Sequence, residues 1–171
     1  MATLANYGYG GTMKNLLSVD EDYNLWVLLY QTTDAVLRAR QKELNQYSIS
    51  VIEVGVLVVI QAIGEKATPS EISRRIFREP HSVSALLNRM EKRGLVRKTQ
   101  DLDRKNLVRV SITEKGQQAY DKSTRRKSIY KIISSLSEEE RRQLRSCLEK
   151  LQNKAFKELT VEYKPPPLPQ F

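Results

Sequence analysis

Polar side chains recur on one face of the helix that the sequence predicts over residues 81–93. Imidazole, hydroxyl, amide and guanidinium groups are the donors and acceptors that read base edges, and the major groove of DNA, about 12 Å wide, admits one helix. This face therefore predicts a contact with duplex DNA. Its residues are His81, Ser82, Ser84, Ala85, Asn88 and Arg89. Two have ordinary alternatives: a plain helix-start residue for His81, and a hydroxyl bonded within its own helix for Ser84.

A second group of charges, "DLDRKN" at residues 101–106, lies between two runs that favour β-strands. "LVRKT" precedes it, and alternating apolar and polar residues follow over 108–113, which predicts a hairpin with charge at its tip. A solvated tip explains one or two charges. Two aspartates followed by Arg104 and Lys105, directly after such a helix, favour contact with DNA.

Arginines also precede the polar helix. Arg74, Arg75 and Arg78 lie on a short helix predicted from residue 69, or just past its end, where phosphate contacts would fix the register on DNA. The chain has a net charge of +9, and residues 65–110 alone carry +6. A compact basic region predicts a polyanionic partner, most simply double-stranded DNA, with a solvated basic surface as the alternative.

Composition argues against other classes of protein. One His and one Cys leave no set of zinc ligands, and the chain has no Gly-rich phosphate loop, nucleophile–base pair or suggestive carboxylate pair. We therefore expect no enzyme, no catalytic residue, no metal and no cofactor. No apolar run has the roughly 20 residues of a membrane span, so no membrane partner is expected. The single cysteine fits a cytoplasmic location.

Residues that can cap a helix N-terminus predict where the helices begin. Ser50 and Glu53 form a capping box before a β-branched run, which favours a buried helix there over a strand. Thr68 caps the next helix, with a proline at its first position and Glu71 closing the box. Residues 68–113 thus predict a helix-turn-helix followed by a β-wing.

The rest of the chain predicts long helices. Gly94 ends the polar helix, Thr113 caps one helix running over residues 114–136, and Ser137 with Glu140 opens the last helix. That helix carries an apolar stripe of Leu144, Cys147, Leu148, Leu151, Ala155 and Leu159.

The expected fold class is mainly α with a small β-hairpin: a winged helix-turn-helix domain plus N- and C-terminal dimerisation helices. The expected divisions are a flexible arm at 1–18, a helical dimerisation region at 19–46 and 114–160, a DNA-binding region at 47–113 and a Pro-rich tail at 161–171.

Residues 82–116, "SVSALLNRMEKRGLVRKTQDLDRKNLVRVSITEKG", resemble the winged helix-turn-helix core of the multiple antibiotic resistance regulator (MarR) family. The shared pattern is a recognition helix, the run Glu91–Val96, an acidic and basic element at 103–105 and Thr-x-x-Gly at 113–116. The resemblance covers residues 68–116 closely, and the flanking helices agree in order and length.

The resemblance implies that Asp103 braces the wing and that Arg104 or Lys105 reaches into the minor groove. Asp101 corresponds to the family's first wing aspartate, with one residue fewer between the two. Lys105 stands where the family usually has a second Arg, which is expected to weaken minor-groove reading, because narrow grooves favour Arg.

Two further departures fall on the recognition helix. Ala85 occupies a place that is often polar or basic in the family, so the family's polar contact with a base is not expected there. Asn88 stands where the family often has Asp, so an ion pair between helix and wing is not expected at that place.

The resemblance also implies a homodimer, with the first helix and the last two as its dimerisation layer. The amphipathic terminal helices support this, because their apolar stripes would otherwise stay exposed. The expected function is a sequence-specific DNA-binding transcriptional regulator, a repressor that binds a pseudo-palindromic operator and is released by a small ligand. The alternative is a winged-helix module that binds protein or structured nucleic acid without regulating transcription.

Two further features have paired interpretations. Tyr23, Trp26 and Tyr30 could line a pocket for a small aromatic effector, but a plain dimer core is favoured. Cys147 could be a redox switch, but its place on the apolar stripe favours a buried small hydrophobe.

Overall fold

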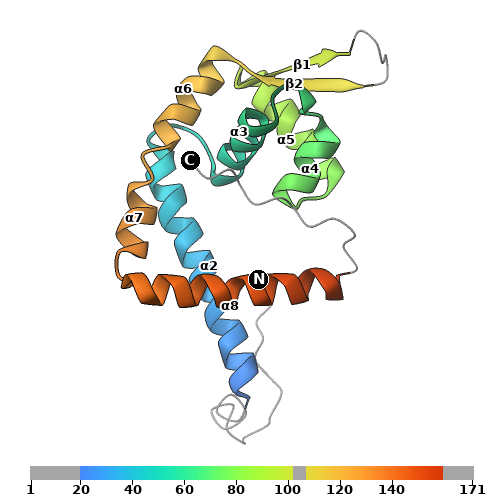
Figure 1. Cartoon of the computed structure of the whole chain (residues 1–171). Helices are drawn as coiled ribbons and strands as arrows, with labels where there is room; N and C mark the ends of the chain where they lie inside the picture. The colour runs from blue at the N-terminus through green and yellow to red at the C-terminus, as the bar shows by residue number, and fades with distance from the viewer. Residues whose placement is uncertain (1–19, 102–106, 160–171) are drawn as a thin grey trace, which may run out of the picture. The chain divides into compact units, whose positions relative to one another are not determined.

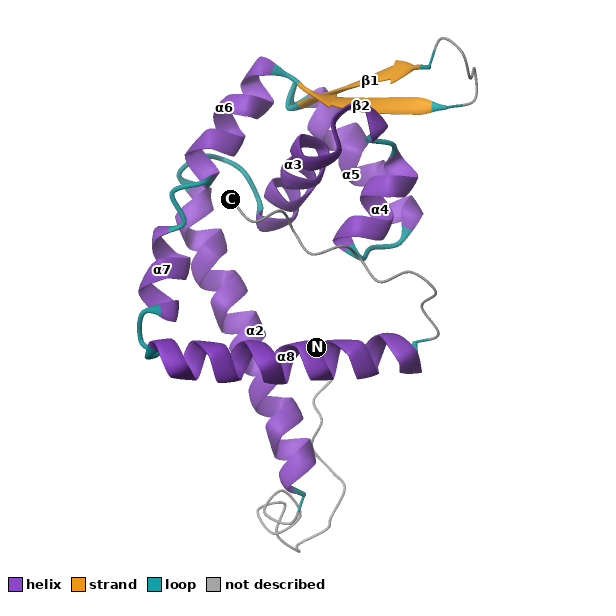
Figure 2. Cartoon of the chain, in the orientation of Figure 1, coloured by secondary structure: helices purple, strands orange, loops and turns teal. Residues whose placement is uncertain are grey.

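The computed structural model describes residues 20–101 and 107–159, which form helices and one two-stranded antiparallel sheet (Figure 1, Figure 2). The elements are α2 (Glu21–Asn45), α3 (Val51–Ile63), the 3-10 turn η1 (Gly64–Lys66), α4 (Pro69–Ile76), α5 (Pro80–Lys92), β1 (Val96–Gln100), β2 (Val108–Ile112), α6 (Glu114–Ser123), α7 (Lys127–Ile133) and α8 (Glu138–Glu158). The predicted fold class, mainly α with a small hairpin, is confirmed. The expected arm and Pro-rich tail lie outside the described residues.

The chain divides into two units, one ending at Arg38 and the other beginning at Ala39. Within the first unit, α2 starts where the Asp20 carboxylate accepts a hydrogen bond from the Tyr23 backbone N–H at 2.9 Å. Its residues 21–38 include none that is buried, although many are apolar. The predicted division into dimerisation and DNA-binding regions stays a prediction.

The β-branched segment at 51–63 is a helix, as its capping box predicts. Ser50 N–H donates to Glu53 Oε2 at 2.8 Å, and Glu53 N–H donates back to Ser50 Oγ at 3.3 Å. This reciprocal pair satisfies two backbone donors that a helix start leaves open. Local capping, together with burial, therefore outweighs the strand propensity of the valines and isoleucines.

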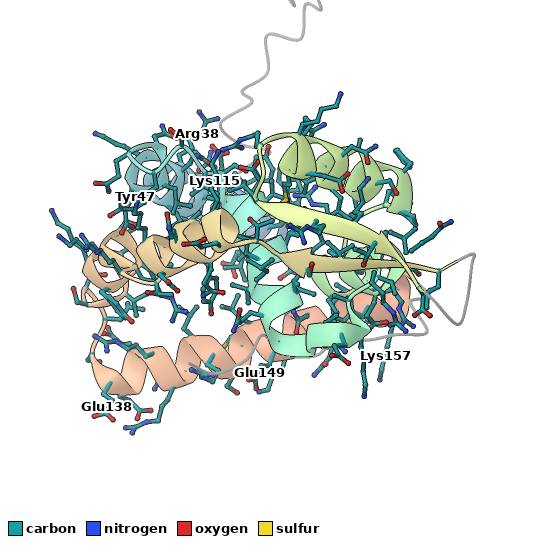
Figure 3. The ribbon with its side chains drawn as sticks, turned by 90° about the horizontal axis from the view of Figure 1, so that it is seen from above. Arg38, Tyr47, Lys115, Glu138, Glu149 and Lys157 are labelled. Carbon is teal, nitrogen blue, oxygen red and sulfur yellow. The ribbon has the colours of Figure 1, made fainter. Side chains whose placement is uncertain are left out.

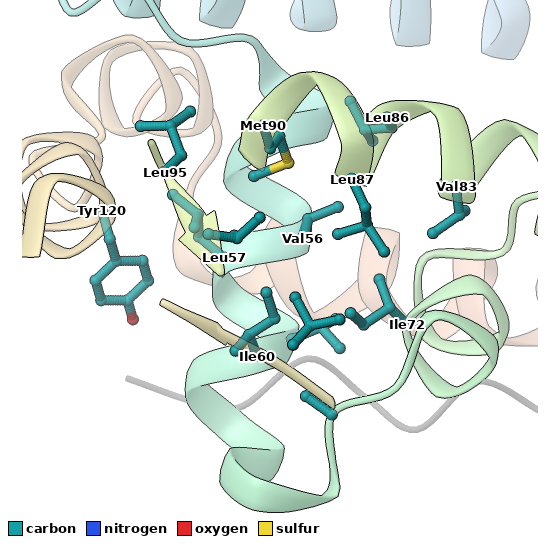
Figure 4. Packing of buried hydrophobic residues seen from close by; sticks show 14 of the residues in the cluster. Val56, Leu57, Ile60, Ile72, Val83, Leu86, Leu87, Met90, Leu95 and Tyr120 are labelled. Carbon is teal, nitrogen blue, oxygen red and sulfur yellow. The ribbon is translucent and has the colours of Figure 1, made fainter. Parts of the chain in front are cut away.

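The core of the second unit gathers on α3. Figure 4 shows Leu57 of α3, Ile72 of α4 and Leu87 of α5 converging, each nearly or fully inaccessible to solvent. Burying such a side chain contributes about 1.5–3 kcal/mol. The same core fixes the hairpin, because Val110 is buried and its backbone N–H donates to Ala67 O at 2.9 Å.

Two glycines join the hairpin to its neighbouring helices. Gly94 follows α5 with φ +71°, the left-handed geometry predicted for it. Thr113 caps α6 by accepting from the Gly116 N–H at 3.0 Å. A Cβ at Gly116 would lie 1.9 Å from the Leu95 carbonyl oxygen. Only glycine fits there, which gives the Thr-x-x-Gly pattern its physical reason.

The single helix predicted over 114–136 is wrong, because the chain breaks between α6 and α7. Arg126 takes the left-handed conformation at φ +48° and ψ +32°, although no glycine or proline is present. The Glu43 carboxylate, 84 residues away in sequence, accepts from Lys127 N–H at 2.9 Å and Ser128 N–H at 3.0 Å. It thereby supplies the N-terminal cap of α7 and holds the break.

Arg40 binds the chain on the α6 side of the break. Its guanidinium donates to Glu43 Oε2 at 2.8 Å and to Ser123 O, at the end of α6, at 2.5 Å. The contacts of Arg40 and Glu43 with the end of α6 and the start of α7 are called the α6–α7 junction here. The Arg40 and Glu43 side chains are only 8% and 9% exposed. Burial alone would raise the pKa of Glu43, but hydrogen bonds from Ser128, Arg40 and Lys127 lower that pKa to about 2.

Beyond the junction, α7 and α8 bury no residue. The Ser137–Glu140 capping box that opens α8 is confirmed. The predicted burial of Cys147 is wrong for the single chain, where this residue is exposed. The leucines of the stripe to which it belongs are exposed too: Leu144 by 42%, Leu148 by 41% and Leu151 by 49%.

A methyl group at position 116 should destabilise the fold strongly. Gly116→Ala is expected to lower the free energy of unfolding by at least about 2 kcal/mol, because the Leu95 backbone cannot yield as a flexible side chain would. Gly55→Ala is the matched control: it lies within α3 with nothing within 4 Å of its Cβ, and should stabilise by about 0.5–1 kcal/mol. Urea denaturation measures both, and equal effects would contradict the steric explanation.

Because the pKa of Glu43 is lowered at the α6–α7 junction, we expect part of the free energy of unfolding to be lost in acid. The folded-state pKa of Glu43 lies below its ordinary value of 4.5, so its carboxylate stabilises the fold above about pH 4.5, and this contribution is lost as the pH falls to about 2. Glu43→Gln should cost about 2–4 kcal/mol at pH 7 and flatten the stability profile between those pH values. A profile parallel to that of the wild type, measured by urea denaturation at each pH, would exclude Glu43 as its source.

Candidate DNA-binding interface

Helix α5 separates an apolar face from a polar one. Val83, Leu86, Leu87 and Met90 are buried, as their spacing predicts. His81, Ser82, Ser84, Ala85, Asn88 and Arg89 are all exposed. The Ser84 hydroxyl makes no hydrogen bond within the described residues and lines a groove of about 380 Å³ between α5 and the hairpin. Its assignment to DNA, like that of the other five, stays a prediction.

A lysine of β1 ties the hairpin to α5. Lys98 Nζ lies 3.0 Å from Glu91 Oε2, and the Lys98 backbone N–H donates to Glu91 Oε1 at 2.9 Å. The same ammonium donates to Asn88 Oδ1. The side-chain and backbone hydrogen bonds from Lys98 lower the pKa of Glu91. An ion pair between helix and wing therefore exists, three residues beyond the place where the family pattern suggested one.

The base of the wing has a second ion pair, which the sequence did not predict. Arg109 Nε lies 2.8 Å from Asp101 Oδ2, and Arg109 Nη1 donates a hydrogen bond to Glu65 O at 2.9 Å. These contacts join both strands of the hairpin to η1. One hint of this pair was present in the sequence, the alternation of apolar and polar residues along β2. In a strand this alternation places Arg109 on the opposite face from the buried Val110.

The tip of the wing lies outside the described residues. Asp103, Arg104 and Lys105 all fall within 102–106, so the predicted acidic brace and minor-groove contacts stay predictions. Within the described residues, Asp101 is the wing aspartate that forms a brace, and its partner is Arg109.

Both arginines of helix α4, Arg74 and Arg75, form ion pairs with the carboxylate of Glu71. Thr68 Oγ1 accepts from the Glu71 N–H at 3.1 Å, but the predicted closure of the box by Glu71 is wrong. The Glu71 carboxylate instead binds Arg74 and lies 2.8 Å from Arg75 Nε. The hydrogen bond from Arg74, followed by that from Arg75, lowers the pKa of Glu71 against the effect of burial.

Other cations near α5 lack such partners. Arg78 and Arg89 are exposed and form no ion pair within the described residues, and the same is true of Lys92 and Arg97. A phosphate contact by Arg78 or Arg89 therefore breaks no existing ion pair, whereas one by Arg74 or Arg75 competes with Glu71.

Three aromatic side chains stack along the part of α2 that belongs to the first unit. The ring centroids of Tyr23 and Trp26 are 5.6 Å apart, and those of Trp26 and Tyr30 are 6.0 Å apart. Trp26 is 57% exposed. The structure therefore brings the three predicted effector residues together on one helix face, without showing what covers them.

A family model described as MarR family matches residues 47–105. The organohalide-sensing transcriptional regulator RdhR, in its 2,4-dichlorophenol-bound form, is 31% identical, with 90% of this chain and 89% of that chain covered and a TM-score of 0.76. The chain belongs to the MarR family. A mutant MarR from E. coli complexed with operator DNA shares the fold, with 19% identity, a TM-score of 0.71 and coverage of 77% of this chain and 95% of that one.

This MarR-family chain is also similar to the HTH-type transcriptional regulator SarZ of Staphylococcus saprophyticus subsp. saprophyticus. The two are 24% identical over 92 residues, which is 54% of this chain. The chain spans 62% of the length of that relative, and the same share of SarZ from Staphylococcus haemolyticus.

Two other kinds of site are absent from the described residues. They contain no group of three or more His, Cys, Asp or Glu side chains that could hold a metal ion. None of their helices combines the length and apolar composition needed to cross a bilayer.

Removing the Glu71 carboxylate should strengthen DNA binding that is independent of sequence. Glu71→Gln releases Arg74 and Arg75 for phosphates, so the slope of log affinity against log salt should steepen by about one to two. Glu149→Gln on α8 is the matched control for the change of charge. Fluorescence anisotropy with a scrambled duplex measures both, and equal slopes would show that the two arginines do not meet phosphates.

Proposed function

We propose that this protein is a sequence-specific DNA-binding transcriptional regulator that binds a pseudo-palindromic operator as a homodimer. The observation that carries the proposal is the exposed polar face of α5, held beside the hairpin by Lys98 and Glu91. Family membership and the 31% identity with a transcriptional regulator support it.

In this proposal, α5 enters the major groove, and its side chains make different contacts with bases and phosphates. His81, Ser82 and Ser84 are in or near the first turn, where a recognition helix meets base edges. Arg89 is exposed and unpaired within the described residues, so it is available for a guanine or a phosphate. Asn88 is already engaged by Lys98, so its base contact costs a hydrogen bond. Ala85 offers only a methyl group, which suits the methyl of thymine.

The wing and α4 supply contacts to the backbone and the minor groove. Arg104 and Lys105 carry the charge at the tip, with Asp103 as their brace. Arg78 is exposed and forms no ion pair within the described residues, whereas Arg74 and Arg75 are engaged by Glu71. These contacts set the register, and α5 supplies the sequence selectivity.

Dimerisation follows from exposed apolar surface. Large apolar side chains line α2 within the first unit and α8 within the second, where water would otherwise meet them. An isologous pairing covers identical surfaces on both chains and presents two copies of α5. Half-sites would then lie about 34–36 Å apart, one helical turn of DNA.

The proposed regulation is repression by steric block, relieved by a small aromatic effector. Such a ligand must bind one dimer arrangement better than the other to shift the population. The RdhR relative was solved with 2,4-dichlorophenol. The stacked Tyr23, Trp26 and Tyr30 are the side chains of this chain that suit an aromatic ring.

Selection of duplexes from a random pool tests the proposal without knowledge of the operator. The enriched sequence should be an inverted repeat, and a scrambled duplex should compete at least about a thousandfold less well at physiological salt. Equal competition by the scrambled duplex would favour the alternative, a winged-helix module without sequence selectivity.

Single substitutions then separate base contacts from phosphate contacts. Arg89→Ala should weaken operator binding by about 1–3 kcal/mol and relax selectivity at one base pair if it reads a base. Lys105→Ala should lower the salt slope by about one. Lys122→Ala on α6, an exposed lysine, is the charge-matched control. An unchanged slope for Lys105→Ala would remove that residue from the interface.

A further inference from the structure

The segment 127–158, called the strap here, comprises α7, its turn and α8. None of the residues in its two helices is buried, so the strap is not held by a core of its own. Figure 3 labels Glu138, the first residue of α8, and Lys157, which lies one residue before its last. Where the strap begins, the buried pair of Arg40 and Glu43 fastens it to the end of α6 and the start of α7.

A second fastening lies near the other end of the strap. The rings of Phe156 on α8 and Phe77 at the end of α4 have centroids 5.2 Å apart and planes inclined by 51°. This is a favourable geometry for an aromatic pair. Phe77 is nevertheless 46% exposed, so it is not a core residue of the helix-turn-helix.

The backbone at Phe77 gives an independent reason to assign the ring a role. Phe77 caps the C-terminus of α4 in the left-handed conformation, with φ +53° and ψ +56°. Glycine is the usual residue there, because a bulky side chain is strained in this conformation. A phenylalanine at a strained, partly exposed position points to a use for its side chain, and its ring pairs with that of Phe156.

The contact falls on the turn that connects α4 to the recognition helix. The turn is closed by Ser73 Oγ, which donates to Arg78 O at 2.5 Å, and by the Phe77 N–H, which donates to Arg74 O at 3.3 Å. Pro80 then starts α5, and His81 and Ser82 follow in its first turn. A shift of Phe77 therefore moves the entry to α5 and the side chains assigned to DNA.

We propose that the Phe77–Phe156 pair makes the position of the strap a determinant of DNA binding. The two phenylalanines are positioning residues: neither contacts DNA, and each acts by holding the helix-turn-helix turn against α8. This rests on the proposed function. Because α8 also carries the apolar stripe assigned to the dimer, the pair links dimer geometry to the placement of α5 within the same chain.

The test compares Phe156→Ala, Phe77→Gly and the double variant with wild type. Phe156→Tyr, which keeps the ring, and Lys157→Ala, its exposed neighbour, are controls. Sedimentation confirms that each variant keeps the wild-type association state, and thermal unfolding reports stability. Phe77→Gly should not lower the melting temperature, because it relieves the left-handed strain while removing the ring.

Operator affinity and hydrogen exchange are the two readouts. Phe156→Ala and Phe77→Gly should each weaken operator binding by about two- to tenfold, the double variant by no more than either, and the two controls not at all. In the free protein, the amides of residues 78, 79, 81 and 82 should exchange faster in both single variants. Wild-type affinity in Phe156→Ala, or unchanged exchange at these four amides, would overturn the proposal. Failure of wild type to prefer an inverted repeat would instead contradict the proposed function, and exchange would still decide the coupling.

Discussion

One chain buries the apolar side chains around α3, but it leaves those of α8 and of residues 21–38 of α2 exposed. Leu57, Ile72 and Leu87 close a core around α3 that needs no other molecule. Leu25 and Trp26 of α2, and Leu151 of α8, remain about half exposed or more. Surface of this kind is costly in water, so a second copy of the chain is the simplest cover.

Electrostatics then divide the cations into two groups. Lys98, Arg109 and Arg40 are engaged by carboxylates and hold the hairpin or the α6–α7 junction in place. Arg78 and Arg89 form no ion pair within the described residues and remain available to phosphates. Some basic side chains in the middle of the chain therefore stabilise the fold, and others are available to bind DNA. The net charge of this region is consequently larger than the number of cations that can contact phosphates without breaking an ion pair. Glu71 is the boundary case, because it restrains two arginines that the sequence assigns to DNA.

Local signals in the sequence predicted most of the elements. Ser50, Thr68, Thr113 and Ser137 each cap the helix that was expected from them, and Gly94 is left-handed as its place after α5 requires. Such features are readable because they involve residues within about four positions of one another.

The sequence-based predictions fail where residues that are distant in the sequence determine the local structure. Nothing within 114–136 shows that Arg126 breaks the helix, because the cause is Glu43, which lies 84 residues from Lys127. The pair of Lys98 with Glu91 and that of Arg109 with Asp101 needed the register of the hairpin. Burial of Cys147 was inferred from a stripe that is real but has no cover in one chain. Assignments at the wing tip depend on residues 102–106, which lie outside the described residues.

The stoichiometry of the complex with DNA tests whether a dimer places two copies of α5 on one operator. Sedimentation velocity of the full chain with a duplex carrying the selected inverted repeat should show two chains per duplex, and a duplex with one half-site replaced should lose most of the affinity. A complex of one chain per duplex, with equal affinity for the half-replaced duplex, would exclude the dimer as the form that binds the operator.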